Sequence, residues 1–256
     1  MFGFLIKKTF FDMWDNLIRI IIYNLGFLLL MAPAVLLLDL AKSNPALWIS
    51  IAVIWVAVLF VYSGVASWAA SQIADYNRPE WSEILSALKA TYPSSLLFAL
   101  TNIVLAFLFS VAFPIYGSFK SFIGPLASSF LFWILVFWIL AFQYFFPLQA
   151  RLERRFLKIL KKMFLLLLDN PLFSFGLFLG SLVILAVSVF TVFLLFGVTT
   201  ILLWWNVALK LRLYKYDYLE KHPDDRRRIP WDALLVEDRE RVGKRTLKGM
   251  IFPWKE

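Results

Sequence analysis

The stretch PLFSFGLFLGSLVILAVSVFTVFLLFGVTTILLWWNVA, residues 171–208, is a run of 38 residues without one charged side chain. As a single helix it would measure about 57 Å at roughly 1.5 Å per residue, nearly twice the roughly 30 Å of hydrocarbon in a bilayer. The surface of residues 173–195 is too apolar to project into water. We therefore expect two membrane spans that turn tightly near Phe196-Gly197.

The whole chain has a similarly apolar composition. Of its 256 residues, 61% are hydrophobic and 17% are charged, whereas a soluble domain is about 45–50% apolar and about 25% charged. The apolar residues gather in blocks long enough to cross a bilayer as helices. The predicted fold is all-α, a polytopic membrane helical bundle in residues 1–214 with interfacial amphipathic helices. Six transmembrane helices are expected, at about 17–38, 46–71, 96–116, 125–147, 171–191 and 194–212.

The basic residues are distributed unevenly between the two sides of such a bundle. With six spans, all of the 26 Lys and Arg residues except Lys42 and Lys120 lie on one side. Because basic loops are retained in the cytoplasm, we expect both termini there, in a multi-pass protein of the bacterial plasma (inner) membrane. With five spans, the basic tail of residues 215–256 would have to cross the membrane.

A basic segment separates the fourth span from the fifth. Its cationic side chains follow helical spacing and share one face: Arg151, Arg154, Arg155, Lys158 and Lys162. Apolar side chains occupy another face: Leu152, Phe156, Ile159 and Met163. Residues 151–162 are therefore predicted to form a basic amphipathic helix at the cytoplasmic interface, with its cations toward the anionic headgroups of the lipid bilayer. A docking site for a partner protein is the alternative. No nucleic-acid partner is expected, because no separate folded basic module is present.

Related segments precede the first, third and fifth spans. Lys8 precedes Asn16 by eight residues and Lys162 precedes Asn170 by the same distance, while Lys89 lies in the segment before the third span. This pattern suggests three repeated units, each an interfacial helix followed by a transmembrane hairpin. Convergence would produce the same pattern, because cytoplasmic helices that enter a membrane tend to carry Lys and Asn.

The centres of the six spans contain no ionisable side chain, which argues against a proton-coupled transporter. Four amide side chains remain in or near the spans: Asn24, Asn102, Gln143 and Asn206. They are expected either to form hydrogen bonds between helices or to line a polar cavity for a sugar-like solute. His222 is the only histidine and the chain has no cysteine, so no metal, cofactor or catalytic residue is predicted.

The tail of residues 215–256 is too short to bury a sizeable core of its own. It alternates apolar and charged residues, and two of its tryptophans, Trp231 and Trp254, each follow a proline. One interpretation is that the tail folds back on the cytoplasmic face. The other is a linear docking element, since exposed Trp and Arg side chains are frequent anchors in interfaces.

Several of these segments carry a family resemblance. They are Tyr144, Phe146-Pro147-Leu148, the basic segment 151–162, Asp169-Asn170-Pro171 and the opening FLIKKTFFDMWDNLIRIIIYNLGFLLL. In them the chain resembles the DUF624 or YesL-like family of bacterial integral membrane proteins of unknown function. Members are often found near components of carbohydrate-uptake ABC transporters, which implies an auxiliary role in sugar uptake. The resemblance supplies no catalytic or ligand residues, and the motif that couples ABC permeases to their ATPases is not recognisable here.

The sequence therefore predicts a non-enzymatic integral membrane protein that acts through partners, among them transporter subunits, as an accessory to a carbohydrate transport system. Its expected contacts are the basic segment and the tail. The alternative is a carrier or facilitator for a small neutral solute. An intramembrane enzyme acting on lipid is a third hypothesis, for which no nucleophile and base are visible. The oligomeric state stays open.

Overall fold

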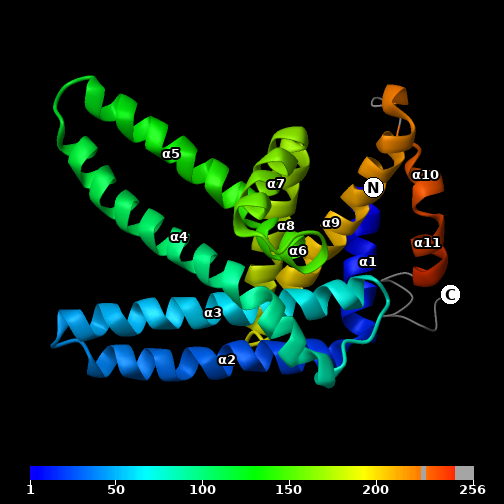
Figure 1. The fold of residues 1–256 in the computed structure, drawn as a ribbon, viewed down its shortest axis with the longest axis horizontal. Helices are drawn as coiled ribbons and strands as arrows, with labels where there is room; N and C mark the ends of the chain where they lie inside the picture. The colour runs from blue at the N-terminus through cyan, green and yellow to red at the C-terminus, as the bar shows by residue number, and fades with distance from the viewer. Residues whose placement is uncertain (226–228, 246–256) are drawn as a thin grey trace.

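The computed structural model describes residues 1–225 and 229–245, and in these residues it is helical throughout, with no strand. Figure 1 shows the order and arrangement of the helices. Their bounds are α1 (Phe2–Asp15), α2 (Leu17–Leu40), α3 (Pro45–Ala74), α4 (Ile84–Ser118), α5 (Ile123–Phe142), α6 (Phe145–Arg151), α7 (Phe156–Asp169), α8 (Pro171–Phe190), α9 (Val198–Lys221), α10 (Trp231–Leu234) and α11 (Val236–Val242). Two single 3₁₀ turns, Trp81–Glu83 and Pro223–Asp225, complete the described chain.

The predicted fold class, an all-α polytopic bundle, is confirmed. Five segments of the described chain are long and apolar enough to cross a membrane: Leu17–Leu40, Pro45–Ala74, Trp81–Ser118, Ile123–Arg151 and Pro171–Phe190. The predicted sixth span corresponds to α9, which is not among them and which carries Lys210, Arg212 and Lys215 in its second half. The count of six spans therefore stays a prediction.

The apolar run of residues 171–208 divides into two helices. Helix α8 ends at Phe190, and α9 begins at Val198, directly after Gly197. Between them the chain reverses through Val192 and Phe193, which have positive φ angles of 50° and 57°. A single 57 Å helix is thereby avoided, and α9 returns through the middle of the molecule.

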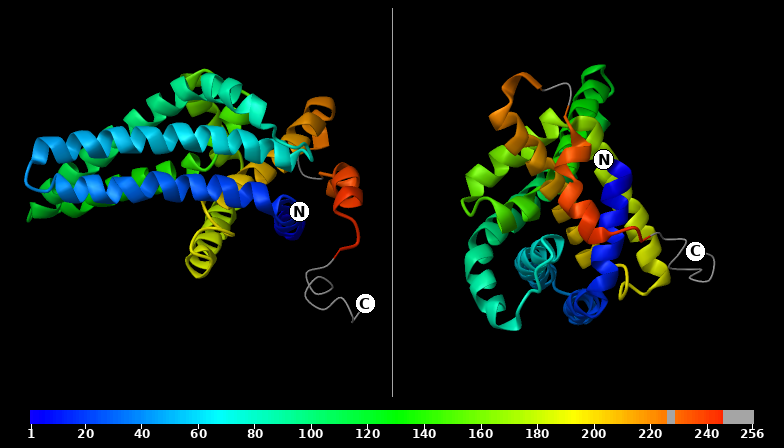
Figure 2. Two further views of the ribbon diagram at one scale, coloured as in Figure 1. Left: turned by 90° about the horizontal axis from the view of Figure 1, so that it is seen from below. Right: turned by 90° about the vertical axis from the view of Figure 1, so that its right-hand side faces the viewer.

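Three helical hairpins diverge from a shared end of the molecule, which we call the base. Hairpin α2–α3 extends in one direction and α4–α5 rises away from it (Figure 1). The turn between α8 and α9, in yellow, points in a third direction (Figure 2). The base is the end where α1, α6, α10 and α11 lie (Figure 1). Small side chains on α3 let the neighbouring helices approach closely there; the buried ones include Ala66, Ala69, Ala70 and Ala74.

Two of the three predicted repeat units have the same local structure. Helices α1 and α7 are both 14 residues long, and a single residue, Asn16 or Asn170, joins each to the next helix. Each asparagine donates a side-chain hydrogen bond to the carbonyl four residues earlier, at 3.0 Å for Asn16 and 3.3 Å for Asn170. The bend between the helices therefore leaves fewer carbonyls unpaired.

The second unit differs from this pattern. Helix α4 is continuous from Ile84 to Ser118, with Pro93 inside it, so the predicted interfacial helix and span are one helix. No asparagine stands at this junction, and the hydroxyl of Ser94 instead donates to the Thr91 carbonyl at 3.3 Å. A separate interfacial helix before the third span was thus a wrong prediction.

Candidate functional site

A cluster of charged side chains, four of the six buried, lies at the base, where four helices and the tail meet. It comprises three cations and three carboxylates: Lys8, Lys210, Arg151, Asp12, Asp75 and Asp238. The Lys8 Nζ atom lies 2.8 Å from Asp12 Oδ2 and 3.6 Å from Asp238 Oδ1. The Lys210 Nζ atom lies 3.1 Å from Asp238 Oδ1 and 3.5 Å from Asp75 Oδ1. Arg151 completes the chain of ion pairs at 2.6 Å from Asp75 Oδ2. We call these six residues the base cluster.

The C-terminal end of α3 explains why two of the cations gather here. The last carbonyls of a helix have no intrahelical partner and carry a partial negative charge. Arg151 donates to the Ser71 carbonyl at 3.1 Å, and Lys210 donates to the Ala74 carbonyl at 3.0 Å. The ring of Tyr76, which follows α3, lies 3.7 Å from Lys8 Nζ and so adds a cation–π contact.

Burial and ion pairing act against each other on the charges of the base cluster. Burial raises the pKa of Asp12 to about 6, although Lys8 draws it down. Burial likewise lowers the pKa of Lys8, against the pull of Asp12. For Asp238 burial also opposes ionisation, but Lys8 and Lys210 outweigh it and hold the pKa below its ordinary value. Of Asp12 and Asp238, Asp12 is therefore the one whose carboxylate takes up a proton at the higher pH.

The free energy of unfolding is expected to fall as the pH rises from about 4 to about 6, because of Asp12. A carboxyl group whose pKa is higher in the folded than in the unfolded chain stabilises the fold below the unfolded pKa, and this contribution disappears by the folded pKa. Between the ordinary value of 3.8 and about 6, the expected loss is about 3 kcal/mol, at roughly 1.4 kcal/mol per pH unit. Denaturant titrations of the intact protein in detergent measure it. The variant Asp12→Asn should lack this part of the decline; parallel curves for the two proteins would contradict the assignment.

The described part of the tail, residues 229–245, folds back across the base. Asp238 of α11 is only 2% exposed within the base cluster, and Leu235 and Val242 are also buried. Arg245 forms a two-pronged ion pair with Asp15 at 2.8 and 3.0 Å. Helix α9 itself continues through Lys221, so the tail leaves the bundle later than residue 215.

Of the two tail tryptophans that were predicted as contact residues, the structure describes one. Trp231 begins α10 and is half-buried, with its ring 5.8 Å from the Arg212 guanidinium. Trp254 lies outside the described residues. Trp231 therefore packs partly against the protein, and only part of its ring is free to contact a partner.

The prediction of one continuous basic helix over residues 151–162 is wrong. Helix α6 ends at Arg151, and α7 begins only at Phe156. Between them, the carboxylate of Glu153 accepts hydrogen bonds from the backbone N–H groups of Arg154 and Arg155, both at 3.2 Å, which stabilises a turn in place of the helix. Arg151 is directed into the base cluster, where its side chain is only 10% exposed, so it offers little surface to a partner or a headgroup.

The remaining basic residues of this segment lie outside the core. Arg154, Arg155 and Lys158 are exposed, and Lys162 is partly so, 3.7 Å from Glu153. The apolar face was also misassigned, because Ile159 and Met163 are buried within the protein rather than facing lipid. The apolar side chains that α7 exposes are Leu157, Leu165 and Leu168. An interfacial position for α7 stays a prediction, with these leucines as the side chains that would contact lipid.

The four amide residues do not converge on one polar cavity. Asn24 of α2 accepts from the Thr199 N–H at 2.9 Å and donates to the Leu194 carbonyl, so it holds the α8–α9 turn. Asn206 of α9 donates to the hydroxyl of Ser67 on α3 at 2.9 Å. Each amide thereby joins a different pair of helices, as interhelical hydrogen bonds in membrane proteins do.

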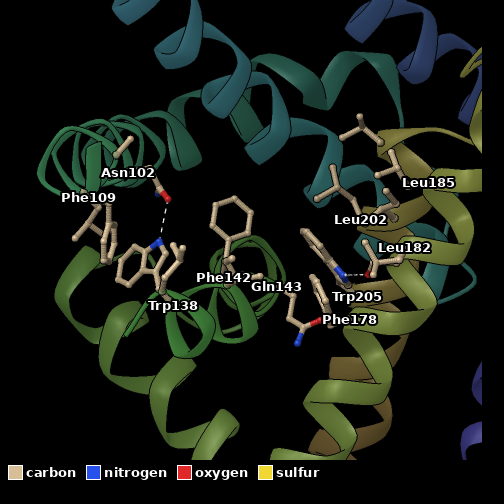
Figure 3. Close-up of a pocket in the computed structure, with 17 residues that line it drawn as sticks. Asn102, Phe109, Trp138, Phe142, Gln143, Phe178, Leu182, Leu185, Leu202 and Trp205 are labelled. Atoms are coloured by element: carbon tan, nitrogen blue, oxygen red, sulfur yellow. Dashed lines mark hydrogen bonds between the residues drawn. The ribbon is translucent and has the colours of Figure 1, made fainter. Parts of the chain in front are cut away.

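Asn102 and Gln143, however, line the same cavity. This cavity of about 470 Å³ lies between α4, α5, α8 and α9 (Figure 3). Asn102 accepts a hydrogen bond from the Trp138 indole at 3.0 Å, and Ser181 accepts one from Trp205 at 2.8 Å. The rest of the wall is aliphatic and aromatic. A sugar would leave most of its hydroxyl groups unpaired here, which is unfavourable.

Two further apolar grooves lie between the other two pairs of predicted repeat units. One of about 430 Å³ lies between α1, α8 and α9, and one of about 540 Å³ lies between α2, α3 and α4. Each of the three spaces is therefore bounded by two neighbouring units. Within residues 1–225 and 229–245, no group of three or more His, Asp or Glu side chains is placed to hold a metal ion.

The base cluster was missed at the sequence level. Its one local signal is the pair Lys8 and Asp12 of α1, four residues apart, which is the spacing of an ion pair within a helix. Its remaining members come from distant parts of the chain, and no spacing connects them. The five long apolar segments of the described chain indicate the class of the molecule, a multi-pass α-helical membrane protein. Comparison with models of protein families, with curated proteins and with solved structures finds no match for the chain.

Proposed function

We propose that the protein is a non-enzymatic membrane protein that acts through partners, as an accessory to a carbohydrate transport system in the bacterial inner membrane. Both termini are cytoplasmic in this proposal. The resemblance to the DUF624 or YesL-like family supports the carbohydrate part. The observation that carries the partner role is the exposure of hairpin α4–α5 toward its turn. In Figure 1 the turn end of this hairpin stands away from α2–α3, and only 6% of the most apolar stretch of Ile123–Arg151 is buried.

The exposed surface of α5 is the contact surface in this proposal. Four large side chains follow helical spacing along one face and are each about half or more exposed: Leu126, Phe130, Trp133 and Phe137. In a bilayer, helices associate through van der Waals packing and interhelical hydrogen bonds rather than through the hydrophobic effect, so such a stripe contributes by packing alone. In this proposal the transmembrane helices of a transporter subunit pack against the stripe. The exposed cations Arg154, Arg155 and Lys158 lie beyond the base end of α5, where they would contact the partner's cytoplasmic side or anionic lipid.

Affinity purification of the intact protein in mild detergent tests this proposal. A membrane subunit of a carbohydrate transporter is expected to co-purify in stoichiometric amount. The triple variant Phe130→Ala, Trp133→Ala, Phe137→Ala should lose it, because the stripe is removed. Replacement of Leu29 and Leu36, two exposed leucines of α2, by Ala is the matched control and should retain it. A clean protein with no stoichiometric partner, or equal loss in both variants, would refute the partner role.

The alternative function, a carrier for a small neutral solute, rests on one observation. Asn102 and Gln143 share a cavity, which is the arrangement that a binding site between repeat units would show. Uptake of labelled sugars into vesicles that contain the purified protein distinguishes the two. Uptake that falls in an Asn102→Leu variant would favour the carrier, whereas the accessory role predicts no uptake by the protein alone.

A further inference from the structure

The helical bundle forms a binding site for one carboxylate at the base. Five of the six members of the base cluster belong to the bundle: Lys8, Asp12, Asp75, Arg151 and Lys210. The sixth, Asp238, is supplied by the tail. Without it, three cations would face two carboxylates, and the two lysines would lose the oxygen that they share. A cation that is shielded from water and left unbalanced is unfavourable, so the site favours an incoming carboxylate.

Tyr76 forms the second part of this site. The centroid of its ring lies 3.7 Å from Lys8 Nζ and 4.7 Å from Lys210 Nζ, and its hydroxyl donates to the Asp238 carbonyl at 3.3 Å. The φ angle of Tyr76 is 62°, the left-handed value that a glycine usually supplies just after the end of a helix. A tyrosine is strained there, and strained residues gather at functional sites. Its ring and hydroxyl give a reason for the strain, because a glycine would make neither contact.

The tail covers this site with a small contact surface. In residues 231–245 the buried side chains are Leu235, Asp238 and Val242, which lie on one face at helical spacing. The outer ion pair of Arg245 with α1 is exposed on both sides, so it is weak and is screened by salt. Two aliphatic side chains and the half-buried Trp231 gain too little to offset the ordering of the whole segment. The attachment of the tail therefore depends on Asp238, and another carboxylate can make the same contact.

We propose that residues 229–245 are a displaceable latch, and that the carboxylate site beneath them binds an acidic amphipathic helix of a partner protein in place of the tail. The side chains that dock the tail define this helix: an aliphatic residue, a carboxylate three residues later and a second aliphatic residue four residues after that. An inorganic anion lacks the two aliphatic anchors. The site is closed while the tail is docked, because Asp238 is 2% exposed and Lys8 has no exposed surface. The inference depends neither on a carbohydrate transporter nor on the stripe of α5.

Thiol labelling of the full chain tests the proposal, because the protein has no cysteine of its own. Val242→Cys places a single thiol on the docked face of the tail, where Val242 is 1% exposed. The probe is a synthetic peptide of residues 229–245, used at millimolar concentration because it competes with a tethered segment. By displacing the tail it should make a maleimide label the thiol at least about tenfold faster. The matched peptide carries Asp238→Asn and should leave the rate unchanged, because it lacks the negative charge.

Further variants separate displacement of the tail from unfolding of the protein. Val207→Cys, in the fully buried part of α9, should stay unlabelled with either peptide. Tyr76→Gly removes the ring but suits the left-handed backbone, so it should loosen the tail and speed the labelling of Val242→Cys without a peptide. Tyr76→Phe keeps the ring over both lysines and should have a smaller effect. Equal acceleration by the two peptides, no acceleration by either, or labelling of Val207→Cys at the same rate as Val242→Cys would overturn the proposal.

Discussion

Replacement of Asp238 by alanine is expected to lower the free energy of unfolding by about 3–5 kcal/mol and to release the tail from the base, because it breaks a buried ion pair on one side only. Asp238 Oδ1 is shared by Lys8 and Lys210. Lys8 has no exposed surface, so its charge cannot be rehydrated while the base stays closed. The three cations of the base cluster would then face two carboxylates.

Two measurements follow the effect of Asp238→Ala. Denaturant unfolding in detergent gives the free energy. Limited trypsin digestion reports whether the backbone of α11 unfolds from the base, because Arg239 and Arg241 have exposed side chains but lie in a folded helix that resists cleavage. The control is Glu237→Ala, which removes the neighbouring carboxylate from an exposed pair with Arg241. An exposed pair contributes about 0–1 kcal/mol, so this variant should remain close to the original protein. Equal stability of the two variants would show that the base cluster does not hold the tail.

The apolar part of the fold was predictable because length and composition decide it. A block of about 20 apolar residues forms a helix in a membrane, since no other backbone arrangement satisfies its own hydrogen bonds there. The division of residues 171–208 follows from the same argument, because a helix of about 57 Å would exceed the bilayer. Length and composition do not settle whether a helix is a span where charged residues interrupt its apolar sequence. Helix α9 is enclosed by other helices at the base, and the charged residues of its second half, four of them basic, exclude it from the segments that length and hydropathy alone identify as spans.

The site was less predictable because its contacts join residues far apart in the chain. Arg151 has the correct spacing for a basic helix face, but Asp75 and the Ser71 carbonyl draw it inward. Helical spacing could not reveal this, because the partner belongs to the end of α3. The amide residues illustrate the opposite case. Hydrogen bonds between helices were expected from residue type alone, but which helices each amide joins depends on the arrangement of the hairpins.

Hairpin α4–α5 meets the rest of the molecule through an aromatic cluster centred on Phe98. Phe98 is fully buried, and its ring stacks on Phe145 of α6 with centroids 3.6 Å apart and an interplanar angle of 8°. Phe60 of α3 and Phe142 of α5 also contact it, at centroid distances of 5.6 and 5.0 Å. One side chain of α4 thereby connects α3, α5 and α6. Few other buried side chains of α4 are as large, so the position of the hairpin depends on this one.

Phe98→Ala is accordingly expected to lower the free energy of unfolding by about 3–5 kcal/mol, the usual result of truncating a buried phenylalanine. The loss comes from missing packing contacts and from the cavity that remains, both of which persist inside a membrane. Phe107→Ala is the matched control, because Phe107 is on the same helix but 65% exposed. Unfolding in detergent compares the two variants. Spin labels at Ser43 and Ser121, in the turns of the two hairpins, should also show a broader distance distribution in Phe98→Ala. If the distribution stays narrow and the stability matches that of Phe107→Ala, the hairpin is held by contacts other than the aromatic cluster.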